Sequence, residues 1–217
     1  MNELTLIIGN KNYSSWSMRP WLLLKYINIP FKEVRIPLYT PESSAELAKY
    51  SPSGLVPVLQ DGDLTVWDSL AIGEYLAEKF PDCNLWPDQL QTKAIARSVS
   101  AEMHSGFTAL RHEMPMNCRA QFQDWKTSTQ AQKDIQRIST IWTDCRNRFG
   151  ADGDMLFGKF SIADAMFAPV AIRFFIYNIE LDSVSRAYMR SLLSFPPVQE
   201  WITAGKQEAE KIDIFEN

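Results

Sequence analysis

The feature that most constrains this chain is a proline inside an apolar run that otherwise has the composition of a β-strand. The run extends from Ser53 to Gln60, with Pro57 near its centre. Because proline has no N–H to donate to a strand ladder, it belongs at a strand edge, at a strand start or in a special local geometry. Asp61-Gly62 follows, and this pair tolerates the positive φ angles of tight hairpins. The segment therefore predicts a β-hairpin with a return strand from Leu64 to Val66.

Strand and helix patterns alternate through the first 80 residues. Short β-prone runs at 4–8 and 31–36 are each followed by a helical pattern, at 17–27 and 42–50, and a further helix is predicted over 69–79. The resulting order is β-α-β-α-β-β-α, and its right-handed crossovers make part of the sheet parallel. This order resembles the thioredoxin-like fold.

The pattern changes after residue 80. Residues 81–88 contain two prolines and have the character of a linker. Beyond them, apolar residues recur every three or four positions, from Ile95 to Met114 and from Ile135 to Phe149, as in helices that face a core. Ser161 and Asp164 have the spacing of a capping box with a structural role. We predict a thioredoxin-like domain (1–80), a linker (81–88) and an all-helical bundle domain (89–217).

Composition excludes several classes of function. The 217 residues carry a net charge of −4, so the chain lacks the excess of basic residues that is typical of a general nucleic-acid binder. No apolar run approaches the roughly 20 residues that span a bilayer, and the first residues lack a signal-peptide pattern. The three cysteines and two histidines lack metal-ligand spacing. We therefore expect a cytoplasmic protein with no metal and with no nucleic-acid or membrane partner.

Two motifs resemble the glutathione transferase family. The proline, the hairpin and the acid-plus-hydroxyl helix start at Asp68-Ser69 resemble its glutathione half-site. The segment from Ser14 to Arg19 resembles the Ser-Ser-Cys-Ser-x-Arg motif of serine-type, zeta-like bacterial members. The resemblance extends over nearly the whole chain and is most specific up to residue 80. It implies a cytosolic homodimer that adds the glutathione thiolate to small hydrophobic electrophiles.

The same resemblance implies a set of glutathione contacts. Pro57 would follow a cis peptide bond, so that the peptide groups of Val56 pair with the cysteinyl part of glutathione as an added strand does. Asp68 and Ser69 would meet the α-ammonium and α-carboxylate of the γ-glutamyl group. Both residues also suit the cap of the helix that follows, and a helix start binds anions well.

Ser14 is the predicted catalytic residue. A hydroxyl that donates to a thiolate lowers the thiol pKa from about 8.5 and raises the concentration of the nucleophile. Ser17, which we also place among the glutathione contacts, and Tyr13 are alternative donors. A cluster of serines also suits plain helix capping. Arg19 either supports this loop electrostatically or is a solvated helix residue.

The second-substrate pocket is predicted from Tyr13, Arg111, Met114 and Asn117. Arg111 could hold an anionic or carbonyl-bearing electrophile. Core packing for Met114 and a surface ion pair for Arg111 are the structural alternatives.

The chain departs from the zeta pattern at three positions. Trp16 replaces the cysteine of the motif, which argues against maleylacetoacetate isomerase and thiol-transferase chemistry. Gly54 and Leu55 replace a lysine and a glutamine, which predicts modest affinity for glutathione. Two alternative functions remain open: a non-catalytic interaction module, because fold does not fix function, and a glutathione-dependent isomerase, which would not consume glutathione.

Overall fold

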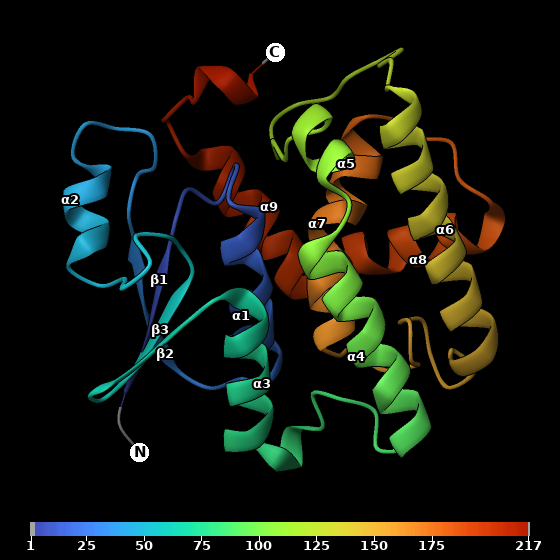
Figure 1. Cartoon of the computed structure of the whole chain (residues 1–217), viewed down its shortest axis with the longest axis horizontal. Coiled ribbons are helices and arrows are strands. Elements are labelled where there is room, and N and C mark those ends of the chain that lie inside the picture. The colour runs from blue at the N-terminus through green and yellow to red at the C-terminus, as the bar shows by residue number, and fades with distance from the viewer. Residues whose placement is uncertain (1–2, 217) are drawn as a thin grey trace.

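A computed structural model describes residues 3–216 (Figure 1). Met1, Asn2 and Asn217, which form the outer ends of the predicted domains, lie outside the described residues. The first part contains, in order, β1 (Leu4–Ile8), α1 (Ser15–Tyr26), β2 (Phe31–Arg35), α2 (Ser43–Ala48), β3 (Val58–Asp61), β4 (Leu64–Trp67) and α3 (Ser69–Lys79). This is the predicted order, and the domain has the thioredoxin-like fold.

The sheet has the strand order β2-β1-β3-β4. β1 is parallel to β2, and Leu4 lies opposite Phe31, as the crossover through α1 requires. β1 and β4 are both antiparallel to β3. The predicted hairpin is confirmed: Asp61 pairs with Leu64, and Gly62 has a φ of +60°.

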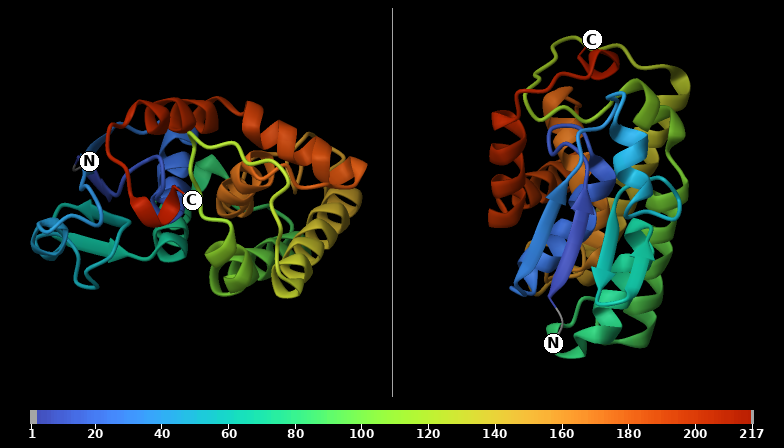
Figure 2. Two further views of the ribbon diagram at one scale, coloured as in Figure 1. Left: turned by 90° about the horizontal axis from the view of Figure 1, so that it is seen from above. Right: turned by 90° about the vertical axis from the view of Figure 1, so that its left-hand side faces the viewer.

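Helices cover both faces of this sheet (Figure 2). Successive side chains of a strand point to opposite faces. Leu4, Leu6 and Ile8 therefore join the main core, which includes the buried faces of α1 and α3. Ile7 points the other way and packs with Leu47 of α2 in a small second core.

The second part of the chain is helical, as predicted. It contains η1 (Pro81–Cys83), α4 (Leu90–Ser105), α5 (Thr108–Glu113), α6 (Thr129–Phe149), α7 (Ile162–Ile176), α8 (Ser183–Ser194), α9 (Pro196–Gln207) and η2 (Asp213–Phe215). α7 is the central helix, with 14 of its 15 residues buried, and it packs against α1, α4 and α8. The predicted capping box of Ser161 and Asp164 is confirmed at its start. In residues 3–216, no helix is long and apolar enough to cross a membrane.

Two predicted elements differ from the structure. The apolar stripe from Ile95 to Met114 belongs to two helices, because Phe107 takes a left-handed conformation with φ 57° between α4 and α5. The strand-like run before Pro57 is irregular, and β3 begins only at Val58. Proline cannot donate to the ladder, so the strand starts after it.

Candidate functional site

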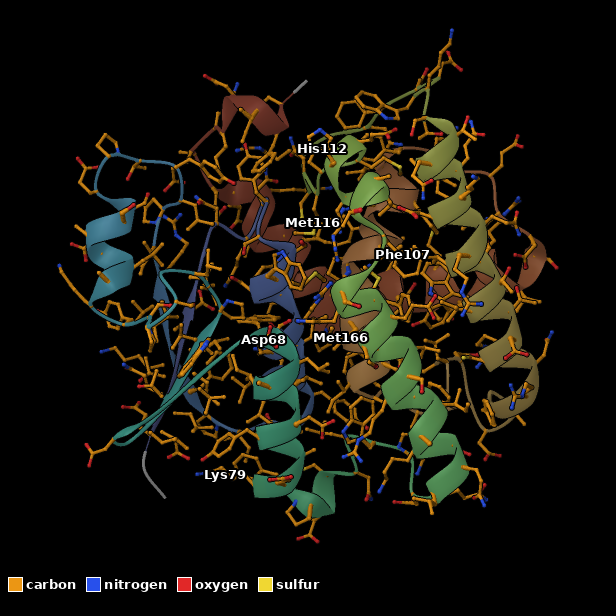
Figure 3. All side chains as sticks on the ribbon, viewed as in Figure 1. Asp68, Lys79, Phe107, His112, Met116 and Met166 are labelled. Atoms are coloured by element: carbon orange, nitrogen blue, oxygen red, sulfur yellow. The ribbon has the colours of Figure 1, made fainter. Side chains whose placement is uncertain are left out.

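A cavity of about 540 Å³ lies between the two domains. Its walls come from the β1–α1 loop, the α2 region, the segment before Pro57, α5 and the loop after it, α7 and the C-terminal segment. The lining residues are Tyr13, Ser14, Ser15, Trp16, Leu38, Tyr39, Thr40, Ser43, Ser44, Leu47, Gly54, Leu55, Val56, Arg111, Pro115, Met116, Arg173, Ile212 and Phe215. Figure 3 labels Met116, which lies on the helical-domain side.

Ser14 lies on the cavity wall at the start of α1. As the N-cap, its Oγ accepts from the Ser17 N–H at 3.4 Å, and its hydroxyl donates to the Ser17 Oγ at 2.7 Å. The N-terminus of a helix also carries a positive partial charge. A thiolate in contact with Ser14 would therefore meet a hydroxyl and a favourable potential together.

Ser17 does not reach the cavity, contrary to its predicted contact with glutathione. It is fully buried, and its Oγ accepts from the Gly9 N–H at 3.1 Å as well as from Ser14. It lies one turn inside the helix, so its side chain faces the protein interior. Its structural role is to orient the Ser14 hydroxyl.

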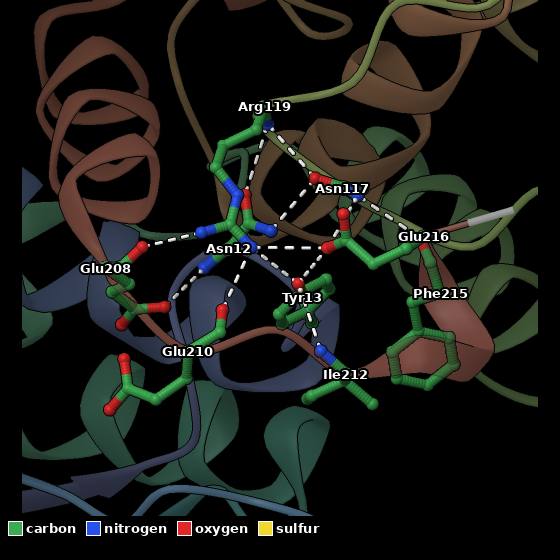
Figure 4. A network of polar contacts seen from close by, with 9 residues as sticks. All are labelled: Asn12, Tyr13, Asn117, Arg119, Glu208, Glu210, Ile212, Phe215 and Glu216. Carbon is green, nitrogen blue, oxygen red and sulfur yellow. Dashed lines mark hydrogen bonds and ion pairs between the residues drawn. The ribbon is translucent and has the colours of Figure 1, made fainter.

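Tyr13 contributes its ring to the cavity, as predicted, but its hydroxyl is already fully engaged. The Oη accepts from the Arg119 Nη2 at 2.6 Å and from the Ile212 N–H at 3.2 Å, and it donates to the Glu216 carboxylate (Figure 4). Burial raises the pKa of Tyr13 above its usual value. Of these two hydroxyls, that of Tyr13 contacts charged side chains, whereas that of Ser14 contacts only Ser17 within the described residues.

Val56 presents unpaired peptide groups at the cavity. The Val56–Pro57 peptide bond is cis. Within residues 3–216, neither the N–H nor the C=O of Val56 makes a hydrogen bond. Leu55 is 67% exposed at the rim. An extended peptide could pair with Val56 here without displacing a contact of the protein.

Asp68 and Ser69 form the predicted cap of α3. The Asp68 carboxylate accepts from the N–H groups of Leu70 and Ala71 at 2.8 and 3.1 Å, and it lies 3.0 Å from the His104 Nε2. Burial lowers the pKa of His104, while the neighbouring Asp68 carboxylate acts in the opposite direction. Neither Asp68 nor Ser69 is among the residues that line the cavity, although Figure 3 shows Asp68 at the start of α3, on the side toward α4.

Arg19 is buried beside this cap, so its interpretation as a solvated residue is wrong. Its guanidinium stacks on the Trp16 ring at 4.1 Å, and its Nη1 donates to the Ser69 Oγ at 3.4 Å. Its Nε and Nη2 have no hydrogen-bond partner within the described part of the chain. Burial, together with repulsion from two other arginines, lowers the pKa of Arg19 to about 9. A buried charge with free donors is suited to an anionic ligand group.

Of the residues predicted for the second-substrate wall on the helical side, Arg111 lines the cavity and its neighbours do not. Arg111 lines the cavity, and its Nη1 donates to the carbonyls of Met103 and His104 instead of forming a surface ion pair. Met114 and Asn117 are buried and do not line the cavity. Because α5 ends at Glu113, the helical spacing no longer applies, and Pro115 and Met116 take these places.

Arg173, Ile212 and Phe215 are among the lining residues that the sequence did not predict. Arg173 reaches the cavity from α7, and Ile212 and Phe215 reach it from the C-terminal segment. Arg173 donates from its Nη2 to the Ser15 Oγ at 3.2 Å. These contacts join residues more than 150 positions apart, and no local motif signals them.

Comparisons with known proteins identify similar sequences and a similar fold. Residues 13–79 match the family of the glutathione S-transferase N-terminal domain. The matched residues run from the loop before α1 to the end of α3. A carnation (Dianthus caryophyllus) protein, glutathione S-transferase 1, is 36% identical over 104 residues, which are 48% of this chain and 46% of that relative. The match thus spans about half the length of that relative.

Two longer matches extend over both domains of the chain. Glutathione S-transferase Z2 of Arabidopsis thaliana is 26% identical over 203 residues, with 87% of this chain and 88% of that protein aligned. A solved glutathione transferase homologue from Burkholderia GL BGR1, with bound glutathione, superposes with a TM-score of 0.71 at 22% identity. That match includes 95% of this chain and 100% of the other, and it shows the shared fold.

Proposed function

We propose that this chain is a serine-type, zeta-like glutathione transferase. The observation that carries the proposal is the position of Ser14 at the wall of a cavity that also exposes the free peptide groups of Val56. The glutathione bound in the Burkholderia homologue supports glutathione as the ligand. Pro57, through its cis bond, would present Val56 to the cysteinyl group. Asp68 and Ser69, with Arg19 behind them, would hold the γ-glutamyl end.

Ser14 would activate the thiol in this mechanism. Its hydroxyl would turn from Ser17 to the glutathione sulfur and donate a hydrogen bond to the thiolate. The hydrogen bond and the N-terminus of α1 both favour the charged form, which lowers the thiol pKa. The thiolate then attacks an electrophile held against the helical domain, so that proximity supplies much of the rate enhancement.

The opposite wall would hold a small electrophile. Apolar surface there comes from the Tyr13 ring, Pro115, Met116, Ile212 and Phe215. Leu55 and Gly54 offer no charged side chain for the glycyl carboxylate of glutathione, so we propose a modest affinity for glutathione.

Calorimetric titration with glutathione tests the proposal. The native chain should bind glutathione, Ser69→Ala should largely abolish binding, and Ser14→Ala should retain binding while losing the ultraviolet absorbance of the bound thiolate. Tyr13→Phe tests the alternative donor: it removes the other nearby hydroxyl and should keep the thiolate signal. Absence of binding at millimolar glutathione would refute the proposal and favour the interaction-module alternative. An assay of glutathione consumption in the presence of an electrophile distinguishes the two reactions, because conjugation consumes glutathione and isomerisation does not.

We also propose a cytoplasmic homodimer, without a nucleic-acid, membrane or metal partner. Two-fold homo-oligomers are the commonest assemblies of soluble proteins. Within residues 3–216, no group of three or more His, Cys, Asp or Glu side chains is arranged to hold a metal ion. Light scattering coupled to gel filtration measures the oligomeric state directly, and a monomeric mass would refute the dimer.

A further inference from the structure

Trp16 stands where the zeta motif has a cysteine, and its ring lies among charged groups of both domains. It lines the cavity from the first turn of α1. The centre of its ring lies 4.1 Å from the Arg19 guanidinium and 5.2 Å from that of Arg111. A cation within about 6 Å of an aromatic face is attracted by the ring electrons. Trp16 therefore attracts both arginines to one place, although their like charges repel each other.

His104 connects the helical domain to this ring and to the cap of α3. It lies in the last turn of α4, and its ring meets that of Trp16 edge-on, with the two centroids 5.3 Å apart. Its Nε2 lies 3.0 Å from the Asp68 carboxylate, whereas its buried Nδ1 has no hydrogen-bond partner within residues 3–216. The tautomer with its hydrogen on Nε2 fits both observations, because it donates to Asp68 and leaves no ring N–H unpaired.

Asp68 has a backbone conformation that needs support from its surroundings. Its φ of 78° is rare for a residue with a side chain, and such a conformation persists only where neighbouring groups fix it. Its carboxylate accepts from the N–H groups of Leu70 and Ala71, and His104 supplies a further donor from the other domain. Because a carboxylate has about four acceptor positions, room remains for another donor, such as an ammonium group.

Ser69, the next residue, is connected to the same two rings through Arg19. The Arg19 side chain is almost fully buried, and its Nη1 donates to the Ser69 Oγ at 3.4 Å. Its Nε and Nη2 have no partner in the described part of the chain, so stacking on Trp16 helps to set the plane of the guanidinium. That plane decides whether the planar fork can meet a carboxylate in a bidentate way. Packing between the domains does not by itself require both connections to end at adjacent residues.

We propose that Trp16 and His104 are positioning residues for the γ-glutamyl end of glutathione. His104 holds the Asp68 carboxylate for the α-ammonium group. Trp16 holds the Arg19 guanidinium behind Ser69, for the α-carboxylate group. The two rings act through other side chains, so they affect the affinity for glutathione and not the ionisation of its thiol. This inference rests on the proposed function and adds a side chain of the helical domain to the glutathione site.

Calorimetric titration with glutathione, followed by ultraviolet absorbance of the bound thiolate at saturation, tests the inference. Trp16→Leu and His104→Leu should each weaken binding about tenfold. The thiolate absorbance per bound glutathione should stay at the native value, because the Ser14 hydroxyl is retained. Trp16→Phe keeps an aromatic face and His104→Gln keeps a side-chain N–H donor, so each should recover most of the native affinity.

A second ligand locates the effect along the glutathione molecule. γ-Glutamylcysteine keeps the γ-glutamyl and cysteinyl groups and lacks the glycyl carboxylate. Each leucine variant should therefore bind γ-glutamylcysteine more weakly than the native chain does, and by the same factor as for glutathione. If the difference between native and variant disappeared with this ligand, the effect would belong to the glycyl end, and the inference would be overturned.

Two control variants change the same residue types elsewhere. His112→Leu alters the other histidine of the chain, which is exposed on α5 and lies well away from Asp68 in Figure 3. Trp125→Leu alters a partly buried tryptophan that packs against Phe122 and Tyr177 and does not line the cavity. Both variants should bind glutathione with the native affinity.

The outcomes separate this inference from the proposed function. A native chain that does not bind glutathione would refute the proposed function and this inference with it. Native binding that both leucine variants leave unchanged would overturn this inference alone, as would a loss that neither Trp16→Phe nor His104→Gln recovers. If Trp16→Leu fails to fold, as judged by its melting curve, His104→Leu at the partly exposed position decides the question.

Discussion

Asp164 is a fully buried carboxylate whose oxygens accept four hydrogen bonds. They come from the N–H groups of Leu156 and Ser161, both at 2.9 Å, from the Ser161 hydroxyl at 2.8 Å and from the Tyr188 hydroxyl at 2.9 Å. Burial raises the pKa of Asp164, while these donors act in the opposite direction. The carboxylate therefore ties the loop before α7 to the start of α7 and to α8.

Replacement of Asp164 by alanine should destabilise the whole helical domain. The substitution leaves several buried donors without an acceptor, so we expect a loss of about 3 kcal/mol or more in the free energy of unfolding. Urea unfolding followed by circular dichroism measures this loss. Asp144→Ala is the matched control, because Asp144 is half exposed and pairs with Arg148 on the surface; it should cost less than about 1 kcal/mol. Equal losses in the two variants would contradict the prediction.

Asp61 at the end of β3 should make stability depend on pH. Hydrogen bonds from Lys79 and Tyr75 hold the pKa of Asp61 below its ordinary value of 3.8. A carboxyl that is more acidic in the folded state stabilises the protein above the unfolded pKa, and that contribution is lost as pH falls through the folded pKa.

The corresponding variant is Asp61→Asn. It should be less stable than the native chain at neutral pH, and the difference should shrink as the pH falls below about 3.8. Thermal unfolding of both chains across this range measures the difference. If the difference in stability between the two chains instead grew as the pH fell, the predicted direction of the pH dependence would be wrong.

At the scale of elements, α9 and the segment after it hold the loop that carries Tyr13 and Ser14. The Glu208 carboxylate accepts from the N–H groups of Lys11 and Asn12 at 2.7 and 3.0 Å, and its side chain is only 8% exposed. The Arg119 guanidinium donates to the carbonyl oxygens of Glu208 and Glu210 (Figure 4). The position of the proposed catalytic hydroxyl therefore depends on residues almost 200 positions away.

Glu208→Ala should loosen this loop specifically. Hydrogen bonds to a charged group contribute about 1.5–3 kcal/mol, so exchange of the Lys11 and Asn12 amide hydrogens should speed up by about tenfold or more. Hydrogen exchange read by NMR or mass spectrometry gives this value. Glu200→Ala, which breaks an exposed pair of α9 with Lys25, should leave these amides unchanged. Unaltered exchange in Glu208→Ala would refute the assigned role.

Elements were predicted more reliably than the cavity wall. Alternating strand and helix patterns, the Asp61-Gly62 turn and the Ser161 capping box depend on neighbouring residues, and each was recognisable from local sequence. Met114 was misplaced because the change of helix at Phe107 and the end of α5 break the helical spacing. Arg173 and Phe215 reach the cavity through contacts between distant segments, which periodicity does not encode.

At the scale of the whole molecule, the C-terminal segment closes the cavity over the N-terminal domain. Ile212 and Phe215 line it, and the Tyr13 hydroxyl bonds both the Ile212 N–H and Glu216. Figure 2 shows this segment crossing from the helical domain to the thioredoxin-like domain. A substitution at Tyr13 should therefore alter how firmly the C-terminal segment is held.

Tyr13→Phe keeps the ring on the cavity wall and removes only the hydroxyl. We expect the segment from Glu208 to Glu216 to open more often, so that trypsin cleaves after the exposed Lys211 about tenfold faster. Mass spectrometry of timed digests measures the rate. Tyr50→Phe, at a partly buried tyrosine beside α2, is the control and should be cleaved at the native rate. A native rate in Tyr13→Phe would mean that the hydroxyl does not hold the segment.

The hydrogen bond between Tyr13 and Ile212 joins residues 199 positions apart, and this separation has a consequence during protein synthesis. At about 5–20 residues per second, a ribosome needs roughly 10 to 40 s after Tyr13 to produce Ile212. Until Ile212 is made, a nascent thioredoxin-like domain exposes Ser14 without the wall to which Ile212 and Phe215 contribute. The cavity between the two domains can therefore be completed only late in synthesis.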